Sequence, residues 1–152
     1  MATRMPEKNV IPPVVLDTNV LVGAGFNPRS ASARILDAVK QQKVRMMWNG
    51  ETRREILRIM QQIPPLRSLD VAQLFLPANR VTAATHPDRF AVVADPDDRK
   101  FAALAREAGA ALISSDEHLL SCRDRIEVLV LTPGAFWRRL KLAQRSGDTA
   151  AT

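Results

Sequence analysis

The order of apolar and polar positions predicts short buried strands that alternate with helices. Residues 14–16, 110–113 and 126–131 are largely apolar runs, and 44–48 is a shorter one of the same type. A continuous apolar run, unlike an alternating one, is typical of a strand that is buried on both faces. Because such runs alternate with helical patterns, we expect parallel βαβ units with right-handed crossovers, and therefore the α/β class.

Capping residues and helix breakers predict where the helices lie. Asn49 suits the N-cap of a helix with apolar residues at i, i+3, i+4 and i+7, which ends before Pro64. Asp95 suits the N-cap of another, Pro96 its first position and Gly109 its end. Further helices are predicted after Ser30 or Ser32, over residues 69–76, after Asp116 and after Thr132.

Other segments are predicted as connections. Residues 23–28 contain two glycines, an asparagine and a proline, so a loop is expected after the first strand. A short strand is predicted at 81–83 and a loop over 85–93.

Length and composition indicate one globular domain. The chain has 152 residues, of which 46% are hydrophobic and 25% charged, enough for a proper core and too apolar for a disordered chain. We expect the domain to span residues 10–142, between loose tails at 1–9 and 143–152. No apolar run approaches the roughly 20 residues that a bilayer span requires, so no membrane association is expected.

Net charge and cysteine content limit which binding partners and which cellular compartment are expected. The formal net charge of +6 fits either a polyanionic partner, nucleic acid first, or general solubility, and charge alone does not choose between them. Cys122 is the single cysteine, which excludes an internal disulfide and a cysteine zinc cluster. This usage fits the reducing cytoplasm.

Two carboxylates directly follow predicted strands. Asp17 comes after the run 14–16, and Asp116 follows Ser114 and Ser115 after the run 110–113. Open α/β sheets place their ligand sites at the carboxyl ends of strands, and in a parallel sheet these ends share one edge. The alternative for Asp17 is a structural one, in which it accepts hydrogen bonds from backbone amides of the next turn.

Two further acids lie near the starts of predicted helices. Glu55 borders the buried face of its helix, although an ordinary surface charge pairing with Arg58 at i+3 is the alternative. Asp98 takes the third position of the helix that Asp95 caps, where it is free to project toward the sheet edge. The alternative is that the acids of residues 95–98 have only a structural role and complement the helix dipole.

These four acids are therefore expected to converge, close enough for one or two cations to bridge them, with Asp95 outside as a cap. Unaided, they repel one another, and at least one should have a raised pKa. Divalent cations make such a cluster tolerable, and oxygen-only ligands suit Mg²⁺ or Mn²⁺ rather than zinc. The expected metal ligands are Asp17, Glu55, Asp98 and Asp116.

At these positions the sequence resembles the PIN domain family of metal-dependent ribonucleases. Residues 16–20 resemble the opening motif of that family, 54–57 its second acid, and 95–98 its third motif, in which the last acid binds metal. Residues 113–116 resemble its fourth motif, with Ser114-Ser115 in place of the usual Thr-Gly, and 131–136 its closing strand and helix. The resemblance implies a three-layer α/β/α sandwich with a central, mostly parallel sheet.

The resemblance also implies a function. Asp17, Glu55, Asp98 and Asp116 would be the catalytic, metal-binding acids of an enzyme that hydrolyses RNA phosphodiester bonds with Mg²⁺ or Mn²⁺. Thr18, Asn19 and Ser114 would orient the carboxylates or bound waters. The alternative for Thr18 and Asn19 is that they are polar only because they lie in a turn. The length resembles the toxin branch of bacterial toxin–antitoxin systems, which implies an antitoxin protein as partner. Family members are often dimers.

Rival functions remain at this point. A haloacid-dehalogenase-type phosphatase needs a second Asp two residues after the nucleophile, where this chain has Asn19, and a response-regulator receiver needs a lysine near the last strand. Neither His86 nor His118 is placed like a general base. The rival from another class is a non-catalytic PIN-like scaffold that binds RNA or protein, against which the acids argue, because a negative pocket repels phosphate.

Overall fold

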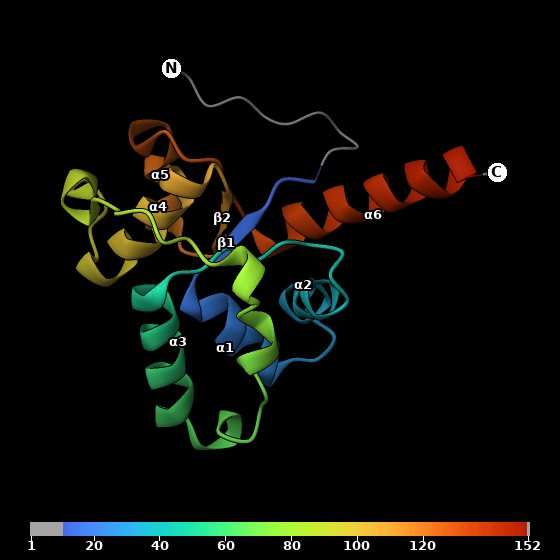
Figure 1. Ribbon diagram of the computed structural model, residues 1–152, viewed down its shortest axis with the longest axis horizontal. Coiled ribbons are helices and arrows are strands. Elements are labelled where there is room, and N and C mark those ends of the chain that lie inside the picture. The colour runs from blue at the N-terminus through green and yellow to red at the C-terminus, as the bar shows by residue number, and fades with distance from the viewer. Residues whose placement is uncertain (1–10, 152) are drawn as a thin grey trace.

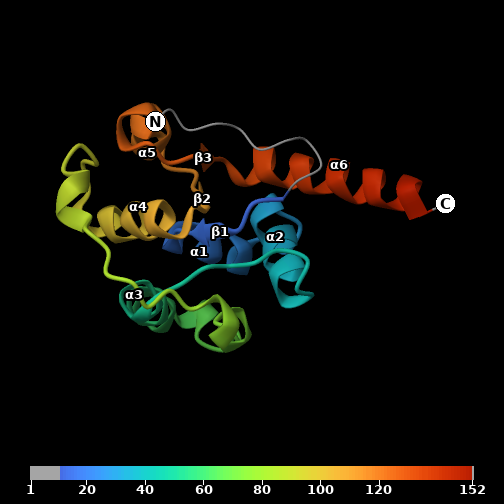
Figure 2. The ribbon, with the colours of Figure 1, turned by 45° about the horizontal axis from the view of Figure 1, so that its top comes forward.

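The computed structural model describes residues 11–151, so the tail expected at 1–9 lies outside the described residues. Figures 1 and 2 show short strands in the middle of the molecule with helices around them. The elements are β1 (Val14–Leu16), α1 (Thr18–Phe26), α2 (Ala31–Lys40), α3 (Gly50–Gln62), α4 (Pro96–Ala108), β2 (Ala111–Ile113), α5 (Glu117–Ile126), β3 (Val130–Leu131) and α6 (Pro133–Ala151). Short 3₁₀ turns η1 (Pro64–Leu66), η2 (Ala72–Leu74), η3 (Pro77–Asn79) and η4 (Pro87–Phe90) link α3 to α4.

The sheet is parallel and has the order β1-β2-β3. Leu16 pairs with Ile113, and Ile113 pairs in turn with Leu131, so the three strands end in register. On the other side of β1, the strand predicted at residues 44–48 is only an extended segment. This segment pairs with β1 through an isolated parallel bridge, in which the Met47 N–H donates to the Val14 carbonyl at 2.8 Å. The predicted α/β class with a parallel sheet is confirmed.

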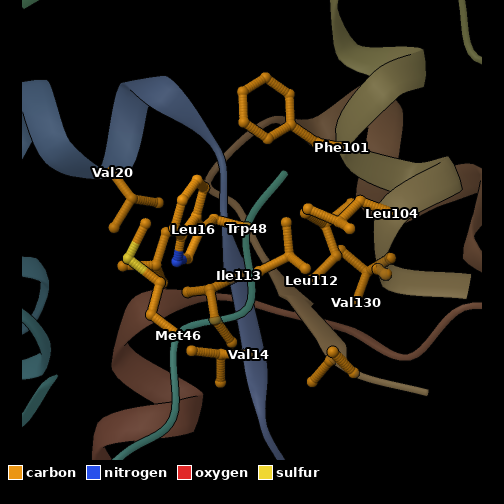
Figure 3. Packing of buried hydrophobic residues seen from close by; sticks show 14 of the residues in the cluster. Val14, Leu16, Val20, Met46, Trp48, Phe101, Leu104, Leu112, Ile113 and Val130 are labelled. Carbon is orange, nitrogen blue, oxygen red and sulfur yellow. The ribbon is translucent and has the colours of Figure 1, made fainter. Parts of the chain in front are cut away.

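The core is built from the continuous apolar runs, as Figure 3 shows. Every residue of β1 and β2 is buried, with exposed fractions of 0–1%. Phe101 and Leu104 of α4 and Phe136 of α6 are also fully buried. Burial on both faces explains why these strands show no alternation of apolar and polar residues.

The segment predicted as a loop after the first strand is instead helix α1. Asp17 caps it, and Val20, Leu21 and Ala24 are buried, so packing of this face outweighs the helix-breaking glycines. At Gly25 a Cβ atom would lie 2.5 Å from Leu66 Cδ2. The glycine therefore permits a close approach between α1 and η1, which periodicity alone does not reveal.

Several predicted elements are shorter than expected. The helix predicted at 69–76 is only η2, and the strand predicted at 81–83 is only the Trp48–Arg80 bridge. The loop predicted over 85–93 contains η4. The last strand does not begin at Ile126, because this residue ends α5 and Glu127 adopts a left-handed conformation with φ of 52°.

The helix ends agree better with prediction. Ser30 caps α2, and Asn49 caps α3 in a capping box with Thr52. Asp95 caps α4, which Gly109 ends with a φ of 61°. Helix α6, in contrast, continues to Ala151 through the segment expected to be a tail from residue 143. A search of the described helices finds none with the length and hydropathy of a membrane span.

Candidate active site

Asp17 and Asp116 lie side by side at the carboxyl edge of the sheet. They follow β1 and β2, and the Asp17 N–H donates to the Ile113 carbonyl at 3.3 Å. Each aspartate also caps the helix that follows its strand: Asp17 Oδ1 accepts from the Val20 N–H at 3.1 Å, and Asp116 Oδ1 accepts from the His118 N–H at 2.8 Å. The structural alternative for Asp17 is therefore realised, and it is compatible with a second role for the carboxylate.

Asp98 joins these two aspartates from the start of α4. Burial and the charges of Asp95, Asp116 and Asp17 raise its pKa to about 7, and a side-chain hydrogen bond with Asp116 acts in the same direction. A hydrogen bond between two carboxyl groups needs a proton on one of them, which favours protonated Asp98. Asp95 is exposed and accepts from the Asp97 N–H at 3.0 Å, so it is a cap, as predicted.

Asp17 is 2% exposed, and this burial is the main reason why its pKa is raised. The charge of Asp116 raises the pKa further, while hydrogen bonds from the Ser114 side chain and from the backbone of Val20 and Asn19 lower it. Two of the four acids therefore have a raised pKa, as predicted, but burial is the largest cause and repulsion between the acids a smaller one. An acid that is costly to ionise gains most when a cation lies beside it.

Ser114 connects the two strand-end aspartates. It is fully buried, its hydroxyl is hydrogen bonded to Asp17, and its Oγ accepts from the Asp116 N–H at 3.0 Å. The serine in place of the family's usual threonine thus keeps a hydroxyl at this point. Asn19 is exposed, and its contact with Asp17 is made by the backbone.

Glu55 is held by partners of its own. It is 8% exposed, and its Oε1 lies 2.7 Å from Lys100 Nζ and 3.9 Å from the Arg58 guanidinium. Thr18 Oγ1 donates to Glu55 Oε2 at 3.4 Å. The expected i+3 contact with Arg58 exists, but Lys100 is the closer partner, and sequence reasoning missed this pair because 45 residues separate its members.

The carboxylates fit a hard divalent cation in their chemistry. They offer only oxygen ligands, which Mg²⁺ and Mn²⁺ prefer, and the like charges around Asp98 are relieved by a cation. Within residues 11–151, however, no three Asp, Glu, His or Cys side chains are grouped closely enough to hold a metal ion. Lys100 already pairs with Glu55 Oε1, so a metal at this acid would have to bind through Oε2 or displace Lys100.

The raised pKa of Asp98 predicts how the stability of the metal-free protein depends on pH. Below the unfolded pKa of about 3.9 the acid is protonated in both states and costs nothing. Between that pH and about 7 the unfolded chain ionises while the folded chain keeps its proton, so the stability falls as the pH rises. Asp98→Asn should therefore raise the thermal midpoint of chelator-treated protein more at pH 8 than at pH 4.5.

The matched control for this measurement is Asp97→Asn, an exposed acid on the same helix. Its thermal midpoint should follow that of the wild type at every pH. An equal effect of the two substitutions at both pH values would show that Asp98 is not the buried, proton-holding acid.

An edge of carboxylates on a parallel sheet defines an acidic site, of the kind in which phosphodiester hydrolases hold divalent cations. Comparison with known proteins agrees with this class. The PIN domain family matches residues 13–118, a range that includes all four acids. An uncharacterized protein, MJ1680, of Methanocaldococcus jannaschii is 30% identical over 123 residues, which are 76% of this chain and 78% of that protein.

The chain belongs to the PIN domain family. PIN domains are generally metal-dependent nucleases, so the family indicates nuclease activity. The acidic edge described above lies within the matched range.

Proposed function

We propose that this protein is a metal-dependent ribonuclease that hydrolyses RNA phosphodiester bonds and acts as the toxin of a toxin–antitoxin pair. The observation that carries the proposal is that the charges of Asp17, Asp98 and Asp116 act on one another, and that the pKa of two of these acids, Asp17 and Asp98, is raised. A cation bound beside these acids would relieve their repulsion and favour their ionised forms. With Glu55, these residues would hold one or two Mg²⁺ or Mn²⁺ ions.

The other polar residues keep the acids in place. Ser114 links Asp17 to the backbone of Asp116, and Thr18 holds Glu55. Such contacts orient ligands to a cation and are typical of metal sites. When bound, the cation supplies a nucleophilic hydroxide from water and offsets charge on the phosphate and the leaving oxygen.

A recess beside Glu55 is lined by three basic and three acidic side chains, and its cations support a phosphate-bearing substrate. It has a volume of about 300 Å³, and Arg54, Arg58 and Lys100 line it together with the acids Glu51, Glu55 and Asp97. Arginine and lysine neutralise backbone phosphates, and the net charge of +6 favours a polyanion in the same way. RNA, rather than DNA, is proposed from the resemblance to the toxin branch.

The test is cleavage of a labelled single-stranded RNA with Mg²⁺ or Mn²⁺, with excess chelator, and after the metal is restored. We expect cleavage with metal, none in chelator and recovery on restoration. A DNA strand of the same sequence is the control and should survive. RNA cleavage that persists unchanged in chelator contradicts the proposed mechanism.

The second candidate is a non-catalytic scaffold that binds RNA or protein. One observation favours it: Glu55 is already neutralised by Lys100, and no metal-binding group of three side chains is assembled in the part of the chain that the structure describes. A protein that binds RNA but does not cleave it with either metal is this scaffold.

Partners and location follow from the toxin proposal. An antitoxin protein should cover the acidic edge, with a basic side chain directed at the carboxylates. A homodimer in the cytoplasm is proposed on the same grounds, and co-purification from the native operon identifies the partner.

A further inference from the structure

A basic recess lies away from the four acids of the candidate site. It has a volume of about 280 Å³ and lies between η4, the C-terminal half of α4 and the end of α5. We name it the α4–α5 recess. Its lining includes His86, Arg89, Phe90, Arg106, Glu107 and Arg125.

Two arginines of the α4–α5 recess are not engaged in ion pairs with the described residues and can bind an anionic ligand. Arg106 forms an ion pair with Glu127 at 2.8 Å and donates to the Ile126 carbonyl. Arg89 and Arg125 are exposed and form no ion pair with any residue that the structure describes. Even when Glu107 and Glu127 are counted, three arginines give the recess a net positive charge.

The helices connect the α4–α5 recess to the acidic edge. Helix α4 carries Asp98 near its start and Arg106 near its end, about 12 Å further along the axis at 1.5 Å per residue. Helix α5 likewise begins after Asp116 and carries Arg125 at its end, about 13 Å away. A few nucleotides of an extended strand span such a distance, so one RNA molecule can contact both places.

We propose that the α4–α5 recess binds a backbone phosphate of the RNA that the acidic site cleaves, an inference that rests on the proposed ribonuclease function. Guanidinium groups match phosphate oxygens with two parallel hydrogen bonds. Phe90 is buried and its ring is not available for base stacking. The contact is therefore to the backbone and independent of base sequence.

The experiment measures RNA binding without cleavage. All proteins carry Asp17→Asn, and the probe is a fluorescent 20-nucleotide single-stranded RNA of mixed sequence in Mg²⁺. The recess variant combines Arg89→Ala with Arg125→Ala. The matched control combines Arg34→Ala with Arg123→Ala, two exposed arginines that do not line the recess, so both variants lose the same charge.

We expect the recess variant to bind the RNA about 5- to 30-fold more weakly, with a salt slope lower by about 0.7 for each lost phosphate contact. The control should bind within twofold of its parent. Arg89→Lys with Arg125→Lys keeps the charge but not the paired hydrogen bonds, and should lie between.

Two results overturn the inference. In the first, the recess variant and the control weaken binding equally, which assigns the effect to general charge. In the second, inorganic phosphate stabilises the parent and not the recess variant while RNA affinity is the same in both, which assigns the recess to a free anion. Failure of the proposed function is separate: a wild type that never cleaves RNA leaves the binding comparison intact.

Discussion

Asp17→Asn is expected to lower RNA cleavage by a factor on the order of 10³. When a metal site no longer stabilises the charge of the transition state, the activation free energy rises by several kcal/mol. Each 1.4 kcal/mol or so lowers the rate by a factor of about ten. The fold should persist, because an asparagine Oδ1 still accepts from the Val20 N–H and this buried position no longer carries a group that is costly to ionise. Single-turnover cleavage at saturating Mn²⁺ measures the rate, and thermal unfolding checks the fold.

Asp124→Asn is the control for this experiment, since Asp124 is exposed, lies outside the recess beside Glu55, and its substitution removes the same charge. Its cleavage rate should stay within about threefold of the wild type, as for most surface changes. Wild-type rates in folded Asp17→Asn would remove Asp17 from the proposed site. The same variant tests the toxin role, because expression of the wild type should slow growth and expression of Asp17→Asn should not.

Lys100→Met is expected to destabilise the metal-free protein by about 2 kcal/mol, because it leaves the buried Glu55 without its closest cation. The figure is below the 3–5 kcal/mol or so of a fully buried pair, since the Lys100 side chain is 23% exposed and partly screened. Chemical denaturation in chelator measures the free energy of unfolding. Adding Glu55→Gln should recover most of the loss.

Arg58→Met is the matched control, because Arg58 lies 3.9 Å from the same carboxylate with a side chain that is 56% exposed. It should cost no more than about 0.5 kcal/mol. If Glu55 binds metal as proposed, Mn²⁺ should also restore more stability to Lys100→Met than it adds to the wild type. If Lys100→Met and Arg58→Met lower the free energy of unfolding equally, the short ion pair between Lys100 and Glu55 does not stabilise the protein more than the longer contact with Arg58.

Local patterns predicted much of the acidic edge. Asp17 and Asp116 follow continuous apolar runs, and a parallel sheet brings strand ends together regardless of loop details. Capping preference placed Asp95 at the N-cap of α4 correctly, but Asp17 and Asp116 cap helices as well, so capping alone does not separate structural acids from site acids. The assignment of these acids as metal ligands stays a prediction.

Other features required contacts between distant residues. The glycines of α1 predict a loop, and only the packing of Val20, Leu21 and Ala24, with Leu66 against Gly25, makes this segment helical. The last strand is cut short by a left-handed Glu127, a backbone choice that a hydrophobicity pattern does not register.

By itself, then, the sequence determined the α/β class, the buried strands, most helix caps and the acids at the strand ends, because each depends on neighbours along the chain. The tertiary structure alone decided that Glu55 pairs with Lys100 and that Arg89 and Arg125 line one recess. These pairings join residues tens of positions apart. Their energies come from burial and Coulomb interactions in three dimensions, which no local spacing specifies.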